Sequence, residues 1–316
     1  MPVTIIDFPK TPADRNMVIA SQADYRRNRP VPGVEKDDLE VEAPPEAKIL
    51  ADIGKAQMKR LNEWRDASIP VLEQRVKKEM NMTGVGDVAE ELFNAFINNK
   101  KEDWSDPGRI VKTFLPGSKI FNTVISDENF RISMMGLRNQ VNSTLVDCFR
   151  TTQTVDYTML REPITNPGGG PVKPPSHHLT WGGMHNLVVN NPLAYALGSI
   201  QGSTVRLKDF KVNADKQEYT ATLTVELFDH FGSDNSDLKD EGMHGTEGQI
   251  CLWILQHERH RESGSPKLNN WPRQPDPDGH YPYVVRLAFE VTFSDPFNEL
   301  GHGLSRPSME IKALLK

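Results

Sequence analysis

The chain has 316 residues, which is enough for one large domain or two ordinary ones. Its hydrophobic content of 37% suffices for a buried core, and its net charge of −6 is modest. No block of lysine and arginine stands out in the sequence. Because nucleic-acid-binding proteins usually carry a basic stripe, the composition argues against that class, and we expect no nucleic-acid partner.

The sequence also argues against a membrane protein. Its longest apolar runs fall far short of the roughly 18 residues that a transmembrane helix needs. The start of the chain lacks the basic and long apolar regions of a secretory signal. We therefore expect a soluble protein, made in the cytoplasm, without a transmembrane segment. Cys148 and Cys251 suit a reducing compartment, although a single bridge between them stays open.

The first half of the chain has mostly helical patterns. Residues 1–45 are polar and rich in proline, which predicts a flexible N-terminal arm. Residues 46–160 form the expected helical region, in which apolar residues recur at helical spacing. The helices that we predict there are Glu46–Asp66, Pro70–Met80, Asp87–Asn99 and Glu128–Thr151, the last with Ser126 or Asp127 as its N-cap.

Residues 161–316 have a different character and begin with a loop rich in proline and glycine. The clearest strand is Glu218–Phe228, where apolar residues alternate with threonine and glutamate. The other strands that we predict are His185–Asn190, Thr204–Val212 and Tyr283–Phe293, and Glu247–His260 is predicted as a helix before a polar insertion at Ser263–His280. The expected fold class is α+β, with a helical N-terminal half followed by a small antiparallel sheet with a packed helix.

The densest patch of titratable groups follows the clearest strand. None of the nine histidines precedes residue 177, and Asp229, Asp234 and Asp237 lie close together in the sequence. Crowded carboxylates raise one another's pKa or bind a cation, and either state serves acid–base or metal-assisted hydrolysis. The alternative is an ordinary turn, because aspartate, glycine, serine and asparagine are turn formers. Whether a divalent metal is bound stays open.

Two groups of histidines are further candidates. His230 follows Asp229 on the opposite face of an extended chain, so one of the two should point into the fold and the other outward. A histidine held by a carboxylate is a competent base, but it can equally be structural. His257 and His260 share a helical face and, with His244, could form a metal site; the alternative is a solvated helix end, since the zincin spacing is absent.

The run Phe228–Gly232, Asp234, Asp237 and the later Leu252–His257 together resemble an uncharacterised proteobacterial domain family. That family carries an Asp-His-Phe-Gly-Leu-Asp signature, then a Trp-Phe-Val-Leu-Gln helix and a closing strand. Segments 91–99, 105–107 and 183–191 are similar to its earlier elements, so the resemblance covers roughly residues 80–295. The chain departs from the family pattern at Ser233, at residues 191–195 and in the insertion at 263–280.

The resemblance implies an antibacterial effector, because members of this family occur with type VI secretion spikes or beside polymorphic toxins. It implies a secretion spike or tip protein and a cognate immunity protein as partners, with delivery into a target cell. In the enzymatic interpretation, the protein hydrolyses peptidoglycan or its lipid-linked precursor. Asp229 is then the base or a ligand, His230 its partner, and Asp234 and Asp237 are electrostatic or metal-binding groups.

The alternative is a non-catalytic binding or adaptor module of a secretion apparatus. In that interpretation, Phe228 and Phe231 anchor the strand end and Gly232 supplies a turn. The two interpretations differ in one structural expectation. The side chains of the Asp-His-Phe-Gly element converge on one cleft in an enzyme, whereas in a scaffold they are buried separately.

Overall fold

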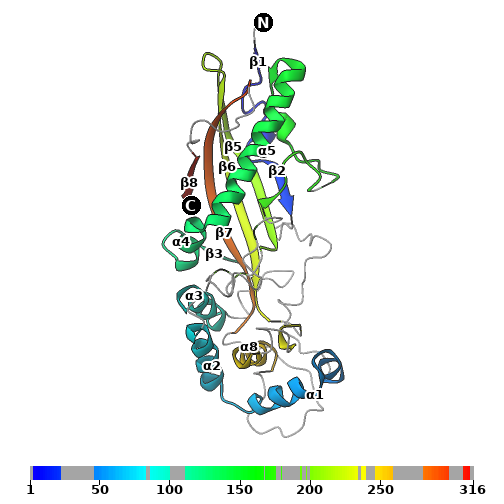
Figure 1. Cartoon of the computed structure of the whole chain (residues 1–316), viewed down its shortest axis with the longest axis vertical. Helices are drawn as coiled ribbons and strands as arrows, with labels where there is room; N and C mark the ends of the chain where they lie inside the picture. Colours follow the sequence, from blue (N-terminus) through cyan, green and yellow to red (C-terminus); the bar gives the residue numbers. More distant parts are fainter. Residues whose placement is uncertain are drawn as a thin grey trace.

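The protein is built around a mixed β-sheet (Figure 1). A long helix lies along one face of the sheet, and a group of helices lies at one end. The computed structural model describes residues 3–22, 46–82, 86–99, 111–166, 168–175, 179, 193, 197, 200–233, 236–239, 246–258, 280–298 and 309–313. Within these ranges, no helix is long and apolar enough to cross a membrane.

The helices and strands follow one another along the whole chain. The α-helices are α1 (Glu46–Trp64), α2 (Ile69–Met82), α3 (Gly86–Ile97), α4 (Lys119–Ser126), α5 (Glu128–Thr152) and α8 (Glu247–His257). The short 3-10 helices are η1 (Pro12–Asp14), η5 (Tyr157–Leu160) and η7 (Ser236–Leu238). The strands are β1 (Thr4–Ile5), β2 (Met17–Gln22), β3 (Val111–Phe114), β4 (Thr154–Val155), β5 (Gly202–Asn213), β6 (Glu218–Phe231), β7 (Tyr283–Pro296) and β8 (Met309–Ala313).

The central pair of the sheet is the antiparallel ladder of β6 and β7. It runs from the pairing of Glu218 with Pro296 to that of Phe231 with Tyr283. With 14 residues in each strand, the ladder is roughly 45 Å long. β5 and then β2 extend the sheet on the β6 side. On the other side, the outer edge of β7 is shared between parallel β3 and antiparallel β8.

The predicted fold class was therefore wrong. The sheet has six strands and is mixed rather than small and antiparallel, and helices and strands are not segregated along the chain, since β2 and β3 lie in the first half. The reason is that two edge strands, β2 and β3, are short and lie in segments with a polar or helical pattern. Their places in the sheet depend on partners far along the chain, which local periodicity does not reveal.

Several predicted elements nevertheless agree closely with the structure. The four N-terminal helices correspond to α1, α2, α3 and α5 within a few residues. The helix predicted at Glu247–His260 corresponds to α8. The Asp127 side chain caps α5 by accepting a hydrogen bond from the backbone amide of Phe130 at 3.0 Å. In the expected arm, β1 and β2 occupy residues 4–5 and 17–22, and residues 23–45 lie outside the described part. The predicted strand His185–Asn190 and most of the insertion also lie outside it.

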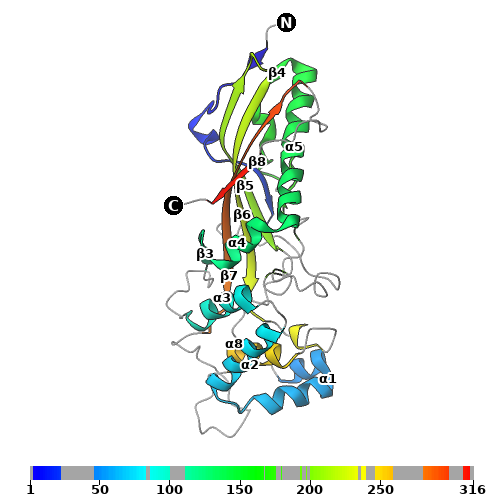
Figure 2. The ribbon, with the colours of Figure 1, turned by 60° about the vertical axis from the view of Figure 1, so that its left-hand side comes forward.

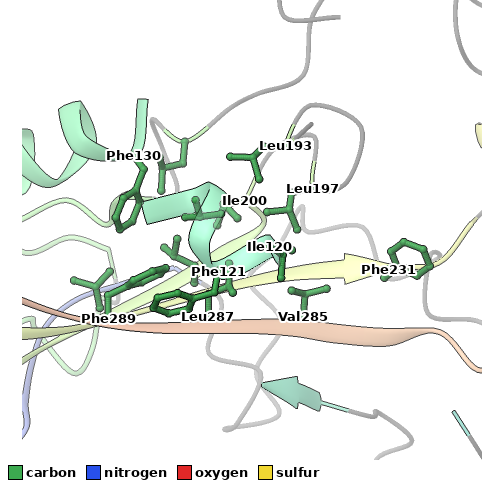
Figure 3. Packing of buried hydrophobic residues seen from close by; sticks show 14 of the residues in the cluster. Ile120, Phe121, Phe130, Leu193, Leu197, Ile200, Phe231, Val285, Leu287 and Phe289 are labelled. Atoms are coloured by element: carbon green, nitrogen blue, oxygen red, sulfur yellow. The ribbon is translucent and has the colours of Figure 1, made fainter. Parts of the chain in front are cut away.

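One face of the sheet, which we call the helix-covered face, packs against α4 and α5. Successive residues of a strand point to opposite faces, so odd-numbered residues of β6 and β7 point to this side. Phe289 of β7 stacks on Phe121 of α4 and lies against Phe130 of α5, with ring centroids 4.8 and 4.7 Å apart (Figure 3). Leu197 and Ile200 join the same buried cluster. This apolar layer fixes which face of the sheet turns inward.

The opposite side of the sheet, which we call the second face, differs between its two ends. In residues 218–224 and 290–296, the open half, its side chains are mostly polar and partly exposed, and Thr222 and Thr292 share a hydrogen bond of 3.1 Å. In residues 226–231 and 283–288, the covered half, even the second face is buried, as at Phe228 and Val284. Both faces of the ladder are therefore buried where it approaches α3 and α8.

The helices α1, α2 and α8 form the helical end, which lies beyond the covered half of the ladder (Figure 2). Polar contacts join its members. Arg65, just after α1, forms a two-pronged ion pair with Glu258, just after α8, with N–O distances of 2.8 Å. The Glu79 carboxylate of α2 accepts a hydrogen bond from the backbone amide of Gly248 at 2.7 Å. A carboxylate at this place also complements the partial positive charge of the α8 N-terminus.

Candidate functional site

The strand-end candidates Asp229 and His230 lie in the covered half of β6. Asp229 pairs with Val285 and His230 with Val284 across the β6–β7 ladder. The two side chains lie on opposite faces of the sheet, as expected, but neither points to solvent, since Asp229 is 3% exposed and His230 8%. Neighbouring residues of a strand point apart, so Asp229 does not hold the imidazole of His230.

Asp229 is a carboxylate on the helix-covered face, among apolar side chains. Leu227 and Phe231 lie on the same side of β6, before and after it. The backbone amide of Gln201 donates to the carbonyl of Phe228 at 3.1 Å, which places Gln201 beside Asp229 along the sheet. The Oε1 atom of Gln201 is buried and accepts no hydrogen bond from any described residue. The strand end therefore carries two neighbouring polar side chains at the rim of an apolar core.

Phe231 and Ser233 tie the strand end to the helices. The Phe231 ring stacks on Tyr283 and lies near Phe96 of α3, with centroid separations of 5.5 and 5.9 Å. The backbone amide of Ser233 donates to Oε1 of Gln256 at 2.9 Å. His257 donates its Nε2 hydrogen to the Ser233 carbonyl at 2.8 Å, because a carbonyl can only accept. Thus Ser233, where the resembling family has leucine, is held through polar contacts with α8.

The candidate metal ligands are only partly within the described residues. His257 is buried, and its ring packs on Trp253 with centroids 4.8 Å apart, so it is not at a solvated helix end. Asp237 lies in η7, and Asp234, His244 and His260 lie outside the described residues. Within the described ranges, no group of three or more histidine, cysteine, aspartate or glutamate side chains is placed to hold a metal ion.

A buried charge cluster on the second face escaped the sequence analysis. The Glu226 carboxylate accepts hydrogen bonds from Nε and Nη2 of Arg286, the former at 3.1 Å. Nε of Arg206 lies 3.8 Å from the same carboxylate, and Nη1 of Arg286 donates to Thr113 at 3.1 Å. These residues come from β3, β5, β6 and β7. The one local signal was Glu226, which follows the run Thr220, Thr222 and Thr224 on this face of β6.

A carboxylate–imidazole pair was also not predicted, and it lies at the same covered end of the ladder, just before β7. His280 precedes β7, and its Nε2 lies 2.8 Å from the Glu73 carboxylate of α2. His280 ends the polar insertion predicted at Ser263–His280, and no spacing pattern in the sequence connects it with Glu73. The carboxylate–histidine arrangement expected at Asp229 and His230 is therefore found between Glu73 and His280 instead.

The two cysteine thiols are further candidates for reactive groups. Cys148 and Cys251 are both buried and unbridged, so the disulfide that the sequence left open is absent between these two described residues. Burial raises the pKa of the Cys251 thiol to about 12, although nearby Arg75 lowers it slightly. Cys251 is therefore protonated at neutral pH and is a poor nucleophile.

Comparisons with protein-family models, with curated proteins and with solved structures found no match.

Proposed function

We propose that this chain is a non-catalytic binding or adaptor module of a secretion apparatus. The observation that carries the proposal is that Asp229 and His230 are buried separately on opposite faces of β6. Catalytic acid–base groups must reach one reacting centre together. In this proposal, the Asp-His-Phe-Gly element has a structural role and anchors the end of β6. Phe231 packs on Tyr283, and the following Ser233 is hydrogen-bonded to α8.

The partner that we propose is a secretion spike or tip protein, and this part rests on the family resemblance of the sequence. A direct test mixes the purified full chain with a purified type VI spike-tip protein and measures binding by calorimetry. We expect a complex of fixed stoichiometry. Weak protein complexes have dissociation constants in the micromolar range. If no binding is detected at such concentrations, the adaptor proposal fails.

Growth of a susceptible bacterium separates the adaptor from an enzyme. The chain is expressed in the cytoplasm, or in the periplasm behind an added signal, each time beside an Asp229→Asn variant. As a matched control, Asp147→Asn changes an exposed aspartate of α5. An adaptor leaves growth unchanged in both compartments, while circular dichroism shows a folded product.

One observation favours a second candidate, an antibacterial effector that hydrolyses peptidoglycan or its lipid-linked precursor. Asp229 is a buried carboxylate beside Gln201, and such groups are costly to bury and often functional. In this case the protein kills from the periplasm, Asp229→Asn abolishes killing, and Asp147→Asn preserves it. Co-expression of a cognate immunity protein would then restore growth. That set of results would replace the adaptor proposal.

A further inference from the structure

We propose that Glu73 and His280 form a proton-operated clamp, which fastens the helical end to the sheet more tightly as the pH falls. The clamp goes beyond the proposed binding function and does not depend on it. His280 precedes β7, at the point where the chain enters the covered half of the ladder. Contacts from two helices converge on this one residue.

His280 is joined to α2 by its side chain and to α3 by its backbone. Its Nε2 atom lies 2.8 Å from Oε1 of Glu73 on α2. Its backbone amide donates to the carbonyl of Phe96 on α3 at 3.1 Å, and its ring meets the Phe96 ring edge-on at 5.8 Å. His280 is only 6% exposed. A change in its protonation state therefore acts on α2, α3 and β7 together.

The neutral imidazole leaves hydrogen-bonding capacity unused at this junction. A neutral histidine has one N–H, and because a carboxylate accepts, that hydrogen is on Nε2. Nδ1 is then a bare acceptor; it is buried and makes no hydrogen bond with any described residue. Asn99 anchors the next residue by donating to the Tyr281 carbonyl at 2.9 Å, and its own Oδ1 is likewise buried and unbonded among these residues.

Uptake of one proton from solvent changes this balance without breaking a covalent bond. The imidazolium donates Nε2–H to Glu73 as a charge-assisted hydrogen bond, which is stronger than the neutral one. Nδ1 becomes a donor, and the Asn99 carbonyl oxygen is a buried acceptor at the same junction. Protonation therefore strengthens the contact between α2 and His280, just before β7.

The backbone of His280 adds a reason for the clamp to act here. Its φ angle is +68°, in the left-handed region that non-glycine residues adopt at a cost. Surrounding contacts must hold such a conformation. Weakening the Glu73 contact therefore favours relaxation of the backbone and release of α2 from the sheet.

Among the described residues, the elements packed against His280 present the following charged and titratable groups. On α2, Glu73 makes the contact, and Lys77 lies one turn further along the same face. Phe96 of α3 packs edge-on against the imidazole, and Asn99, just after α3, donates to the Tyr281 carbonyl; neither residue titrates. In β7, burial raises the pKa of Tyr283 well above its usual range, so this phenol stays neutral. Glu73 is thus the group that determines the sign of the effect.

The sign follows from proton linkage. A histidine in an unfolded chain titrates at about pH 6.5. In the proposed clamp, burial disfavours the imidazolium, the adjacent Glu73 carboxylate favours it, and the carboxylate outweighs burial, so that the folded protein titrates at higher pH. The extra stability is fully present below about pH 6.5, and it is lost as the pH rises through the higher midpoint of the folded state. The clamp is therefore tight in mild acid and looser at alkaline pH.

The test compares thermal unfolding of the full chain with that of His280→Gln between pH 5 and 9. The difference in Tm between the two proteins should be largest at the acid end and shrink through neutral pH. Glu73→Gln should remove most of this pH dependence, whereas Glu218→Gln, at an exposed position of β6, should keep it. A difference in Tm that is constant, or that grows with pH, overturns the proposal.

A second measurement does not require His280→Gln to fold. Titration of the His280 imidazole by NMR in the full chain should give a midpoint above about 6.5, which falls in Glu73→Gln. A midpoint at or below that value overturns the clamp. Neither readout involves a secretion partner or bacterial growth, so failure of the clamp and failure of the proposed function are distinguishable.

Discussion

The open and covered halves of the β6–β7 ladder come from the same two strands and follow the same alternating pattern, but their environments differ. In the open half, the helix-covered face is apolar and the second face is polar and partly exposed. In the covered half, both faces are buried, and the polar residues Glu226 and Asp229 are buried with them. Alternation in a sequence thus identifies a strand and its two faces, but it does not reveal what covers the second face.

The two halves contain a matched pair of cross-strand ion pairs. Arg286 and Glu226 pair in the covered half, whereas Lys208 and Glu290 pair at the open half, where the lysine side chain is 45% exposed. Both pairs join a basic side chain to a glutamate, but only the Lys208–Glu290 pair is exposed to solvent.

Glu226→Gln should have the largest effect. It leaves the buried guanidinium of Arg286 without its carboxylate, and breaking a buried pair in this way costs about 3–5 kcal/mol of unfolding free energy. Urea unfolding of the variant measures the loss. The double variant Glu226→Gln with Arg286→Met removes both charges and should recover much of the stability. A loss below about 1 kcal/mol for the single variant would show that the covered half is wetter than the structure indicates.

Phe231→Leu should have an intermediate effect. It preserves most of the buried apolar volume but removes the stacking on Tyr283 and the contact with Phe96. Because aromatic pairs contribute about 0.5–1.5 kcal/mol beyond burial, we expect a loss of about 1–2 kcal/mol. Hydrogen exchange should also report faster opening at the start of β7. An unchanged exchange rate there would mean that the ring does not fasten the strand end.

Lys208→Met should change the unfolding free energy by less than about 1 kcal/mol, because exposed ion pairs contribute little. Half-molar salt should reduce even this difference, whereas the effect of Glu226→Gln should persist in salt. Denaturant titrations at two salt concentrations check both statements. An effect as large as that of Glu226→Gln would remove the distinction between the halves.

The double variant Thr222→Val with Thr292→Val should have the smallest effect. It removes one hydrogen bond on a partly exposed face and replaces it with β-branched side chains that suit a strand, so we expect a change within about 0.5 kcal/mol. The Tm relative to the parent protein is the measurement. A loss of several degrees would show that this hydrogen bond contributes as much as a buried one and would remove the contrast between the two halves.

The sequence was informative where structure is local. The helical spacing of apolar residues located α1, α2, α3 and α5, and the alternation of β6 identified the longest ladder. It did not predict β2 and β3, because each is a short edge strand whose partner lies far along the chain. The pattern of residues 17–22 is compatible with a strand only once β5 is present beside it.

The candidate site was predictable in its position but not in its geometry. The alternation rule correctly placed Asp229 and His230 on opposite faces, but the outward direction expected for one of them was wrong, because the second face is covered there. The contacts of Ser233 with α8 and of His280 with Glu73 join segments that no sequence spacing relates. Tertiary contact alone creates them.

The shared outer edge of β7 has a consequence for how the protein folds. β3 and β8 pair with neighbouring stretches of β7, although they come from residues 111–114 and 309–313. In the same way, β2 can pair only after β5 has been synthesised. Closing such long loops before any contact forms makes folding slow relative to helical proteins of similar size. The edge of β7 stays incomplete until residues 309–313 have left the ribosome. Until then it is an open template for another strand, and nascent chains therefore need protection from aggregation.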